Sequence, residues 1–194
     1  MILAANITNV YYIRVMKILV VTDVQRDFFD PHGSLYVKGG EALPSRIVEI
    51  AGNYDGIIFT LDWHPGDHCS FKEQGGPWPP HCVAFTQGAG LADEFAPLLA
   101  DGALIHFKGE DAGREQYAAF ENLEEDDPIR TVLAMADQID VCGIAGDYCV
   151  KETVASILRH ADASKVAIVE DCTVSIDNGD TLKAFIKENN VRTK

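Results

Sequence analysis

Residues Gly143–Val150 read Gly-Ile-Ala-Gly-Asp-Tyr-Cys-Val, which places a cysteine where a strand changes into a helix. Before them, Ile139–Ile144 is a short β-branched run that ends in small residues, as expected of a strand. After them, apolar side chains recur at helical spacing and predict a helix over Val150–Ala161. The free N–H groups and positive dipole end of a helix N-terminus favour a thiolate and can hold a developing oxyanion. Cys149 is therefore the candidate nucleophile.

Strands alternate with helices along the rest of the chain. Lys17–Asp23 is a continuous apolar run closed by a carboxylate, the pattern of a strand buried on both faces of a parallel sheet. Similar runs predict strands over Gly56–Leu61, Ala103–Phe107, Ile139–Ile144, Lys165–Glu170 and, in truncated form, Val191–Lys194. Helices are expected over Ala42–Gly52, Leu91–Ala100, Pro128–Gln138, Val150–Ala161 and Thr181–Asn189. The alternation predicts a three-layer α/β fold in which a mostly parallel, Rossmann-like sheet carries helices on both faces.

Chemically active side chains stand at the carboxyl ends of four predicted strands. They are Asp23, Asp62, Lys108 and Cys149. Parallel α/β sheets bind ligands at this edge, so these side chains are expected to meet there. A long loop rich in Pro, Gly and His follows the second strand up to about Gly90, and loops of that length are usually functional or disordered.

Cys149, Asp23 and Lys108 together can carry nucleophilic catalysis. A free thiol is mostly protonated at neutral pH, so the cysteine needs a base. Asp23 can accept the proton, and Lys108 can supply positive charge to both groups. Taken one at a time, these residues have plainer interpretations: a buried structural thiol, a turn cap and a solvated charge. Their joint position at strand ends favours catalysis.

The loop after the second strand carries residues of the types that ligate metals. One carboxylate and three imidazoles fall within a short span, namely Asp62, His64, His68 and His81. This set suits one divalent ion with a working role; zinc is expected, with iron and manganese as alternatives. Cys69 and Cys82 adjoin two of the histidines, so a structural zinc site with thiolate ligands is a rival, and unrelated surface histidines are another.

Phe28, Trp78 and Tyr117 can line a slot for a flat ligand. Each of these aromatic residues, taken singly, is more often part of a core than of a pocket wall.

Composition excludes several classes of function. The 194 residues are 47% hydrophobic and 24% charged, which is ordinary for a globular protein, and a single domain over residues 16–194 is expected. The net charge of −14 argues against nucleic acid or a membrane surface as partner. Five cysteines without a C-x-x-C pair indicate a reducing, cytoplasmic compartment.

Residues 1–15 read as an N-terminal extension or a start-site artefact, because Met16 directly precedes a predicted strand. No apolar run approaches the ~18–20 residues of a membrane span. Domains of this type often associate through an exposed sheet edge or helix pair, so a homo-oligomer is a further expectation.

Several short motifs follow one another between residues 17 and 176. They are Asp23-Val24-Gln25-Arg26-Asp27-Phe28 with Gly33-Ser34-Leu35, then Asp62-Trp63-His64-Pro65, Trp78-Pro79-Pro80-His81-Cys82-Val83, Lys108-Gly109 and Gly146-Asp147-Tyr148-Cys149-Val150. In this order they resemble the nicotinamidase branch of the isochorismatase-like cysteine hydrolases. The metal motif separates this branch from relatives that share only an Asp–Lys–Cys triad.

The resemblance implies hydrolysis of nicotinamide to nicotinate and ammonia through a thioester, as in NAD salvage, with pyrazinamide as a second substrate. It also implies a role for each matching residue: a triad of Asp23, Lys108 and Cys149; metal ligands Asp62, His64 and His81, with His68 ligating in some members; ring walls Phe28, Trp78 and Tyr117; and an oxyanion hole of the backbone N–H groups of Ala145 and Cys149. A cis peptide near Ile144–Ala145 is a further implied feature.

The chain departs from the family pattern at Gly146, where Thr is usual, and this glycine is expected to loosen the turn that carries the nucleophile. Two rival functions stay open. One is hydrolysis of another small amide or carbamoyl group by the same triad, and the other is a non-catalytic metal-binding homologue.

Overall fold

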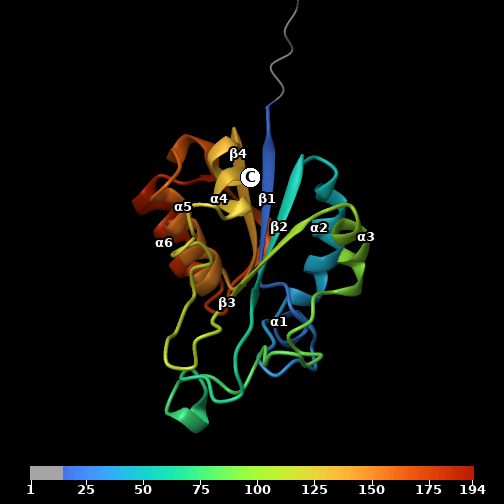
Figure 1. Cartoon of the computed structure of the whole chain (residues 1–194), viewed down its shortest axis with the longest axis vertical. Helices are drawn as coiled ribbons and strands as arrows, with labels where there is room; N and C mark the ends of the chain where they lie inside the picture. The colour runs from blue at the N-terminus through green and yellow to red at the C-terminus, as the bar shows by residue number, and fades with distance from the viewer. Residues whose placement is uncertain (1–14) are drawn as a thin grey trace, which may run out of the picture.

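Six parallel strands form a single sheet in the order β3-β2-β1-β4-β5-β6 (Figure 1). The computed structural model describes residues 15–194, so all but the last residue of the expected extension over residues 1–15 lies outside it. The strands are β1 Lys17–Thr22, β2 Gly56–Asp62, β3 Leu104–Lys108, β4 Gln138–Ile144, β5 Val166–Val174 and β6 Arg192–Thr193. The prediction of an α/β fold around a Rossmann-like parallel sheet is confirmed.

β1 lies at the centre of the sheet because its residues are apolar on both faces. Ile18, Leu19, Val20 and Val21 are fully buried, and β1 pairs with β2 on one side and β4 on the other. β4 approaches β1 so closely at Gly143, where φ is +125°, that any side chain there would overlap the Thr22 carbonyl. Glycine is the residue that this contact requires.

Helices cover both faces of the sheet, as Figure 1 shows. On one face, α2 (Leu43–Ala51) and α3 (Ala96–Ala100) pack with the short α1 (Arg26–Phe29) into one hydrophobic cluster. On the other face, α4 (Pro128–Met135), α5 (Lys151–Leu158) and α6 (Asp180–Asn189) enclose a second cluster. Single 3-10 turns, η1 (Gly40–Ala42), η2 (Lys72–Gln74), η3 (Asp93–Phe95) and η5 (Ala163–Lys165), punctuate the connections.

Helix boundaries differ from the predicted ones where local chemistry overrides apolar periodicity. The helix expected over Leu91–Ala100 is α-helical only from Ala96, because Pro97 occupies the first turn, where proline is tolerated. α4 ends at Met135 rather than at Gln138, since Gln138 pairs with Lys17 as the first residue of β4. The helix expected from Val150 begins with a π-helical turn, η4 (Gly146–Val150), before α5.

The strand order reverses direction between β1 and β4. Chains leaving these two neighbouring strands diverge to opposite faces, and this switch point opens a crevice at the carboxyl ends of the strands. Asp23 follows β1 and Cys149 follows β4, so both stand at the crevice. Within residues 15–194, no helix is long and apolar enough to span a membrane.

Candidate active site

Lys108 connects the charged side chains of the crevice. Its ammonium group contacts Asp23 Oδ2 at 2.8 Å, also pairs with Asp62, and lies 3.6 Å from Cys149 Sγ. Lys108 is only 1% exposed, so these groups replace water around its charge. Burial opposes the charged form, yet Asp23 and Asp62 together hold the pKa of Lys108 well above its usual range. Lys108 is therefore a cation.

Asp23 is the candidate base, and one of its carboxylate oxygens lies within 4.8 Å of Cys149 Sγ. Its backbone adopts a left-handed conformation with φ of +49°, which Asp tolerates better than most residues. Thr60 Oγ1 donates a hydrogen bond to Asp23 Oδ1 at 2.7 Å and fixes the carboxylate. Complete burial, with a smaller contribution from nearby Asp62, raises the pKa of Asp23, although Lys108 opposes this. A carboxylate with a raised pKa is a better proton acceptor.

Burial of Cys149 acts against the thiolate that a helix N-terminus is predicted to favour. Burial raises the pKa of Cys149 well above its usual value; Lys108 opposes the rise and Asp23 adds to it. Cys149 lies within the π-helical turn η4, and the regular helix α5 begins only at Lys151. Cys149 Sγ lies within 4.8 Å of carboxylate oxygens of Asp23 and Asp62, so a base is close by.

The turn that carries Cys149 is held by its neighbours. The Val150 N–H donates to the Ala145 carbonyl at 3.0 Å in a π-helical bond, a geometry common at functional sites. The buried Asp147 carboxylate accepts backbone hydrogen bonds from Ile176 and Asp177 at 3.0 and 3.1 Å. The peptide bond Ile144–Ala145, next to this turn, is cis, as the resemblance implied.

Gly146 does not leave a void in the turn. A Cβ at this position would overlap Ser175 Oγ and lie 2.9 Å from Leu182 Cδ2. Side chains from the loop after β5 and from α6 thus fill the space that a larger residue would need. These contacts run against the expectation that Gly146 loosens the turn.

Three candidate metal ligands converge beside the triad. Ligand atoms of Asp62, His64 and His81 all lie within 4.8 Å of one another, and all three residues are buried. His64 Nδ1 is 2.9 Å from the Gly109 carbonyl and His81 Nδ1 is 2.8 Å from the Pro79 carbonyl. Because a carbonyl only accepts, both Nδ1 atoms carry the proton and both Nε2 atoms offer a lone pair. This donor set fits a divalent ion.

The protonation of these imidazoles depends on burial and on Asp62. Burial lowers the pKa of His81, which favours the neutral ring that ligates metals. Burial also acts against the charged form of His64, but the Asp62 carboxylate raises the pKa of His64 overall. Although burial acts against the charged form of Asp62, Lys108 holds the pKa of this carboxyl far below its usual range.

His68 does not join this convergent group. Its Nδ1 is 2.7 Å from Ser70 Oγ and its Nε2 is 3.1 Å from the Arg114 carbonyl, so both ring nitrogens have partners. The ring stacks on His64 with centroids 4.0 Å apart. Cys69 and Cys82 also lie outside every group of convergent ligand atoms formed by residues 15–194, which leaves the rival thiolate zinc site without support.

A second group of convergent ligand atoms in the crevice, which contains two carboxylates and the thiol, does not resemble a metal site. Ligand atoms of Asp23, Asp62 and Cys149 also converge, but the Lys108 ammonium contacts all three. A resident cation already balances these groups, so the imidazole-rich group is the better candidate for a metal.

The predicted aromatic residues line one pocket with the cysteine. Phe28, Trp78 and Tyr117 share its wall with Asp62, His81, Ala145 and Cys149. Trp78 Nε1 donates to the Tyr117 hydroxyl at 3.1 Å. Burial raises the pKa of Tyr117 to about 12, so this hydroxyl stays neutral at physiological pH. The three aromatic side chains therefore present flat, uncharged surfaces beside the nucleophile.

Sequence reasoning missed Tyr148 and Ile176, which line the same pocket. The Tyr148 ring lies 5.3 Å from Trp78 and 5.4 Å from Tyr117, completing an aromatic corner. Its position directly before Cys149 was the available signal. Ile176 could not be found from the sequence, because only the fold of the β5–α6 loop brings it to the site.

Gln25 is a further residue whose role emerges only from the structure. Its buried amide accepts from the Asp62 N–H at 2.8 Å and donates to the Asp62 and Ala89 carbonyls at 2.8 and 2.9 Å. Asp27 similarly accepts from the Cys82 N–H at 2.7 Å. Together they tie the segment after β1 to the loop that carries the candidate metal ligands.

Comparisons with known proteins identify the family of this chain. Residues 17–190 match the isochorismatase domain family. The Mycobacterium tuberculosis nicotinamidase/pyrazinamidase is 36% identical over 184 residues, which cover 89% of this chain and 94% of that protein.

Two solved structures are similar throughout. PnC1 from L. infantum, in complex with nicotinate, has a TM-score of 0.81 at 32% identity and covers 93% of this chain and 92% of that one. The pyrazinamidase of Pyrococcus horikoshii, in complex with zinc, has a TM-score of 0.74 at 30% identity and covers 92% of this chain and 98% of that one. Because the family match and the structural likeness both extend over nearly the whole chain, this chain belongs to the isochorismatase domain family.

Proposed function

We propose that this chain is a cysteine amidohydrolase that converts nicotinamide to nicotinate and ammonia, and that it accepts pyrazinamide in the same pocket. The observation that carries the proposal is a single aromatic pocket that holds both a thiol flanked by Asp23 and Lys108 and the convergent set of Asp62, His64 and His81. The names of its relatives support the substrate, since they are a nicotinamidase/pyrazinamidase and an enzyme bound to nicotinate.

In the first step, Asp23 accepts the Cys149 proton as the sulfur attacks the carboxamide carbon. Proton transfer accompanies attack because burial raises the pKa of the Cys149 thiol and so disfavours a free thiolate. Lys108 stays protonated throughout and orients the Asp23 carboxylate at 2.8 Å. The backbone N–H groups of Ala145 and Cys149 are the proposed donors to the carboxamide oxygen, which becomes negative as the C–S bond forms.

In the second step, the tetrahedral adduct collapses. Protonated Asp23 transfers its proton to the leaving nitrogen, the C–N bond breaks, and ammonia departs to leave a thioester on Cys149. Asp23 then takes a proton from water, whose oxygen attacks the thioester carbon. The C–S bond breaks, the proton returns to sulfur, and nicotinate is released.

Asp62, His64 and His81 are the proposed ligands of one divalent ion. Zinc is the first candidate, because the Pyrococcus horikoshii relative was solved with zinc; iron and manganese accept the same ligands. When bound, such an ion supplies a Lewis-acid position for the ring nitrogen of the substrate. Phe28 and Trp78 then face the ring, which turns a loose encounter into an oriented one. His68 is proposed to support His64 by stacking.

We also propose a small-molecule role in a reducing, cytoplasmic setting, as part of NAD salvage. All five cysteines are free thiols, and disulfides form readily in oxidising compartments. A nucleophilic thiol needs the same reducing conditions to stay active.

The test is ammonia release from nicotinamide by the intact protein, before and after chelation, with Cys149→Ala as the inactive variant. Cys172→Ala is the matched control, because Cys172 is a buried thiol outside the pocket. We expect turnover that requires both Cys149 and the metal and that Cys172→Ala retains.

The other outcomes separate the rival functions. Turnover that survives chelation would remove the metal from substrate positioning and leave the triad intact. Turnover of other amides or carbamoyl compounds, with none of nicotinamide, would reassign the substrate. Failure on every amide, with metal bound, would favour the non-catalytic homologue.

A further inference from the structure

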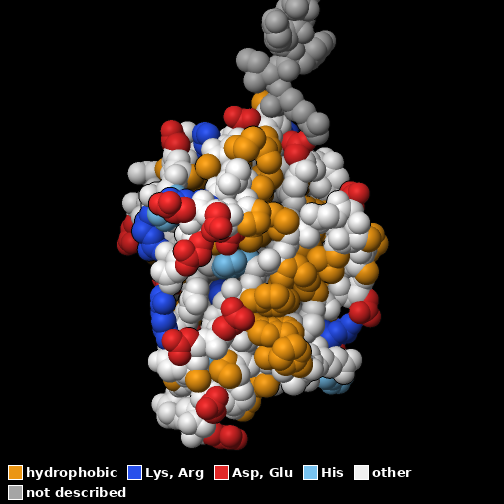
Figure 2. Space-filling model, in the orientation of Figure 1, with side chains coloured by type: hydrophobic (Ala, Val, Ile, Leu, Met, Phe, Trp, Pro, Cys, Tyr) orange, Lys and Arg blue, Asp and Glu red, His pale blue; other side chains and the backbone are white. Residues whose placement is uncertain are grey.

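Four apolar side chains form an exposed patch beside strand β3. We call it the edge patch and define it by Trp63, Phe85, Ile105 and Phe107. Phe85 is 91% exposed, and Ile105 and Phe107 are 42% and 40% exposed. Trp63 joins the other rings, with centroids 5.3 Å from Phe85 and 4.9 Å from Phe107. Figure 2 shows a band of hydrophobic side chains across the face over which β3 runs in Figure 1.

The strand at this patch is an open sheet edge. Among residues 15–194, β3 pairs only with β2, so its outer side has no strand partner. Open edges usually carry charged residues or proline that prevent further pairing. β3 reads Leu-Ile-His-Phe-Lys, and its one permanently charged side chain, Lys108, is buried in the active site. The edge therefore lacks the usual protection.

Phe85 adds a second sign that the patch is covered in solution. Its φ of +65° is left-handed, which is unfavourable for a bulky aromatic residue. The strained backbone presents the ring outward, next to Trp63. Exposed aromatic clusters of this kind mark interaction sites more often than free surface.

We propose that a second copy of this chain covers the edge patch, with the two β3 strands paired antiparallel about a two-fold axis. A two-fold contact needs a surface that complements itself, and an open strand does so because antiparallel pairing satisfies both edges equally. The same operation sets one edge patch against the other, so strand pairing and apolar burial support each other.

Charge favours this face over the rest of the surface. A net charge of −14 on each chain repels a second copy. The four residues of the edge patch are uncharged, whereas acidic side chains gather beside the hydrophobic band in Figure 2. Asp101 and Glu110 flank β3 and are exposed, so they belong to the rim of the interface. Salt screens such repulsion, and association should therefore strengthen as ionic strength rises.

The patch is large enough for the apolar centre of a dimer. Fully buried aromatic side chains contribute roughly 150–250 Å² each, so the edge patch supplies on the order of 300 Å² from Phe85 and its half-exposed neighbours. Stable interfaces bury about 800 Å² per partner, with an apolar centre and a polar rim. The paired strand edges and the flanking loops supply the remainder.

Sedimentation of the intact protein tests this proposal by measuring its molecular mass in solution, over a wide range of protein concentration and at low and high NaCl. We expect a dimer that is tighter at high salt. Phe85→Glu should raise its dissociation constant about 100-fold or more, because it places a charge in the centre of the interface. Ile105→Lys should do the same from the strand edge. Met135→Glu is the matched control: Met135 is 65% exposed, lies at the end of α4, and should leave the dimer intact.

Several results would overturn the proposal. They are an unsubstituted chain that stays monomeric at every concentration, an assembly that both Phe85→Glu and Ile105→Lys leave intact, equal loss in Met135→Glu, and an assembly that weakens with salt. Phe85 itself is not among the residues that line the pocket, so the Phe85→Glu monomer should keep its turnover. Failure here is thereby distinguishable from failure of the proposed amidase activity.

Discussion

A single residue, Lys108, balances the negative charges of the crevice. Two buried carboxylates, Asp23 and Asp62, face its ammonium group, and removing the cation leaves them facing each other without water. We expect Lys108→Met to lower kcat/KM by about 10³-fold or more and to cost about 3–5 kcal/mol of unfolding free energy. Turnover and urea unfolding measure both effects.

The control for that prediction is Lys151→Met, which breaks an ion pair with Glu152 on the surface. Surface pairs contribute about 0–1 kcal/mol, so little change is expected. If Lys108→Met unfolded like the unsubstituted chain, the two carboxylates would not depend on Lys108 as described.

Gly109 orients the His64 ring through its backbone carbonyl. Its carbonyl holds His64 Nδ1, its φ is +69°, and a Cβ there would lie 2.6 Å from that nitrogen. We expect Gly109→Ala to displace the imidazole and to weaken metal binding about 10–100-fold, as loss of a ligand's hydrogen-bond partner does. Bound metal per chain, titrated against a competing chelator, measures this.

Gly113→Ala is the matched control, because a Cβ there meets only Asp111 Oδ1 at 3.6 Å. Equal metal affinity in the two alanine variants would contradict the role assigned to the Gly109 carbonyl.

The turn η4 packs against two neighbouring segments, the loop after β5 and helix α6. A Cβ at Gly146 would overlap Ser175 Oγ beyond β5 and press on Leu182 of α6. We expect Gly146→Ala to cost about 1–3 kcal/mol of unfolding free energy and to lower kcat, because the displaced turn carries Cys149. Combining it with Ser175→Gly should recover part of both losses.

A double-mutant cycle on unfolding free energy and kcat checks this coupling. Strict additivity of Gly146→Ala and Ser175→Gly would show that the two residues do not compete for the same space. The same cycle bears on the rival function, since a well-packed turn at Gly146 argues against a site that has lost catalysis.

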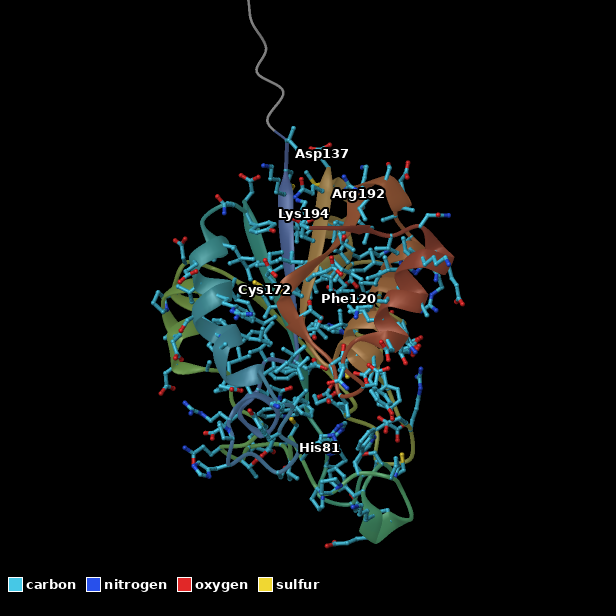
Figure 3. All side chains as sticks on the ribbon, turned by 180° about the vertical axis from the view of Figure 1, so that it is seen from behind. His81, Phe120, Asp137, Cys172, Arg192 and Lys194 are labelled. Atoms are coloured by element: carbon cyan, nitrogen blue, oxygen red, sulfur yellow. The ribbon has the colours of Figure 1, made fainter. Side chains whose placement is uncertain are left out.

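In the whole molecule, the candidate active site and a second buried polar cluster lie towards opposite ends of the sheet (Figure 3). In Figure 3, His81 lies at one end of the sheet, and Asp137, Arg192 and Lys194 lie at the other. Towards this second end, the buried carboxylate of Asp140 accepts from Tyr54 and Gln138 and pairs with Lys194 at 2.8 Å. Burial and Asp140 raise the pKa of Tyr54, which keeps its hydroxyl a donor.

We expect Tyr54→Phe to lower the unfolding free energy by about 1–2 kcal/mol, because a buried charged acceptor loses a donor, and to leave kcat/KM unchanged. Urea unfolding and turnover test both parts. Tyr36→Phe removes a similar hydrogen bond from the exposed Glu41 and should change stability little. A fall in kcat/KM for Tyr54→Phe would contradict the separation of the two ends.

The sequence by itself determined the elements and the edge at which they act. Continuous apolar runs such as Lys17–Thr22 specify strands buried on both faces, and the carboxyl ends of parallel strands meet at one edge whatever their order. Asp23, Lys108 and Cys149 could therefore be predicted to converge from their positions at strand ends alone. The metal set was also predictable, because its spacing is local to one loop.

Only the tertiary structure decided how these groups behave. Burial, which depends on the whole fold, raises the pKa of Cys149, whereas local helix chemistry alone favours a thiolate. His68 turns to Ser70 and Arg114 because a loop distant in sequence offers a carbonyl. Ser175, which is also distant in sequence, fills the space beside Gly146. Spacing along a chain fixes which residues are near in sequence, whereas desolvation and hydrogen-bond partners come from segments that only folding brings together.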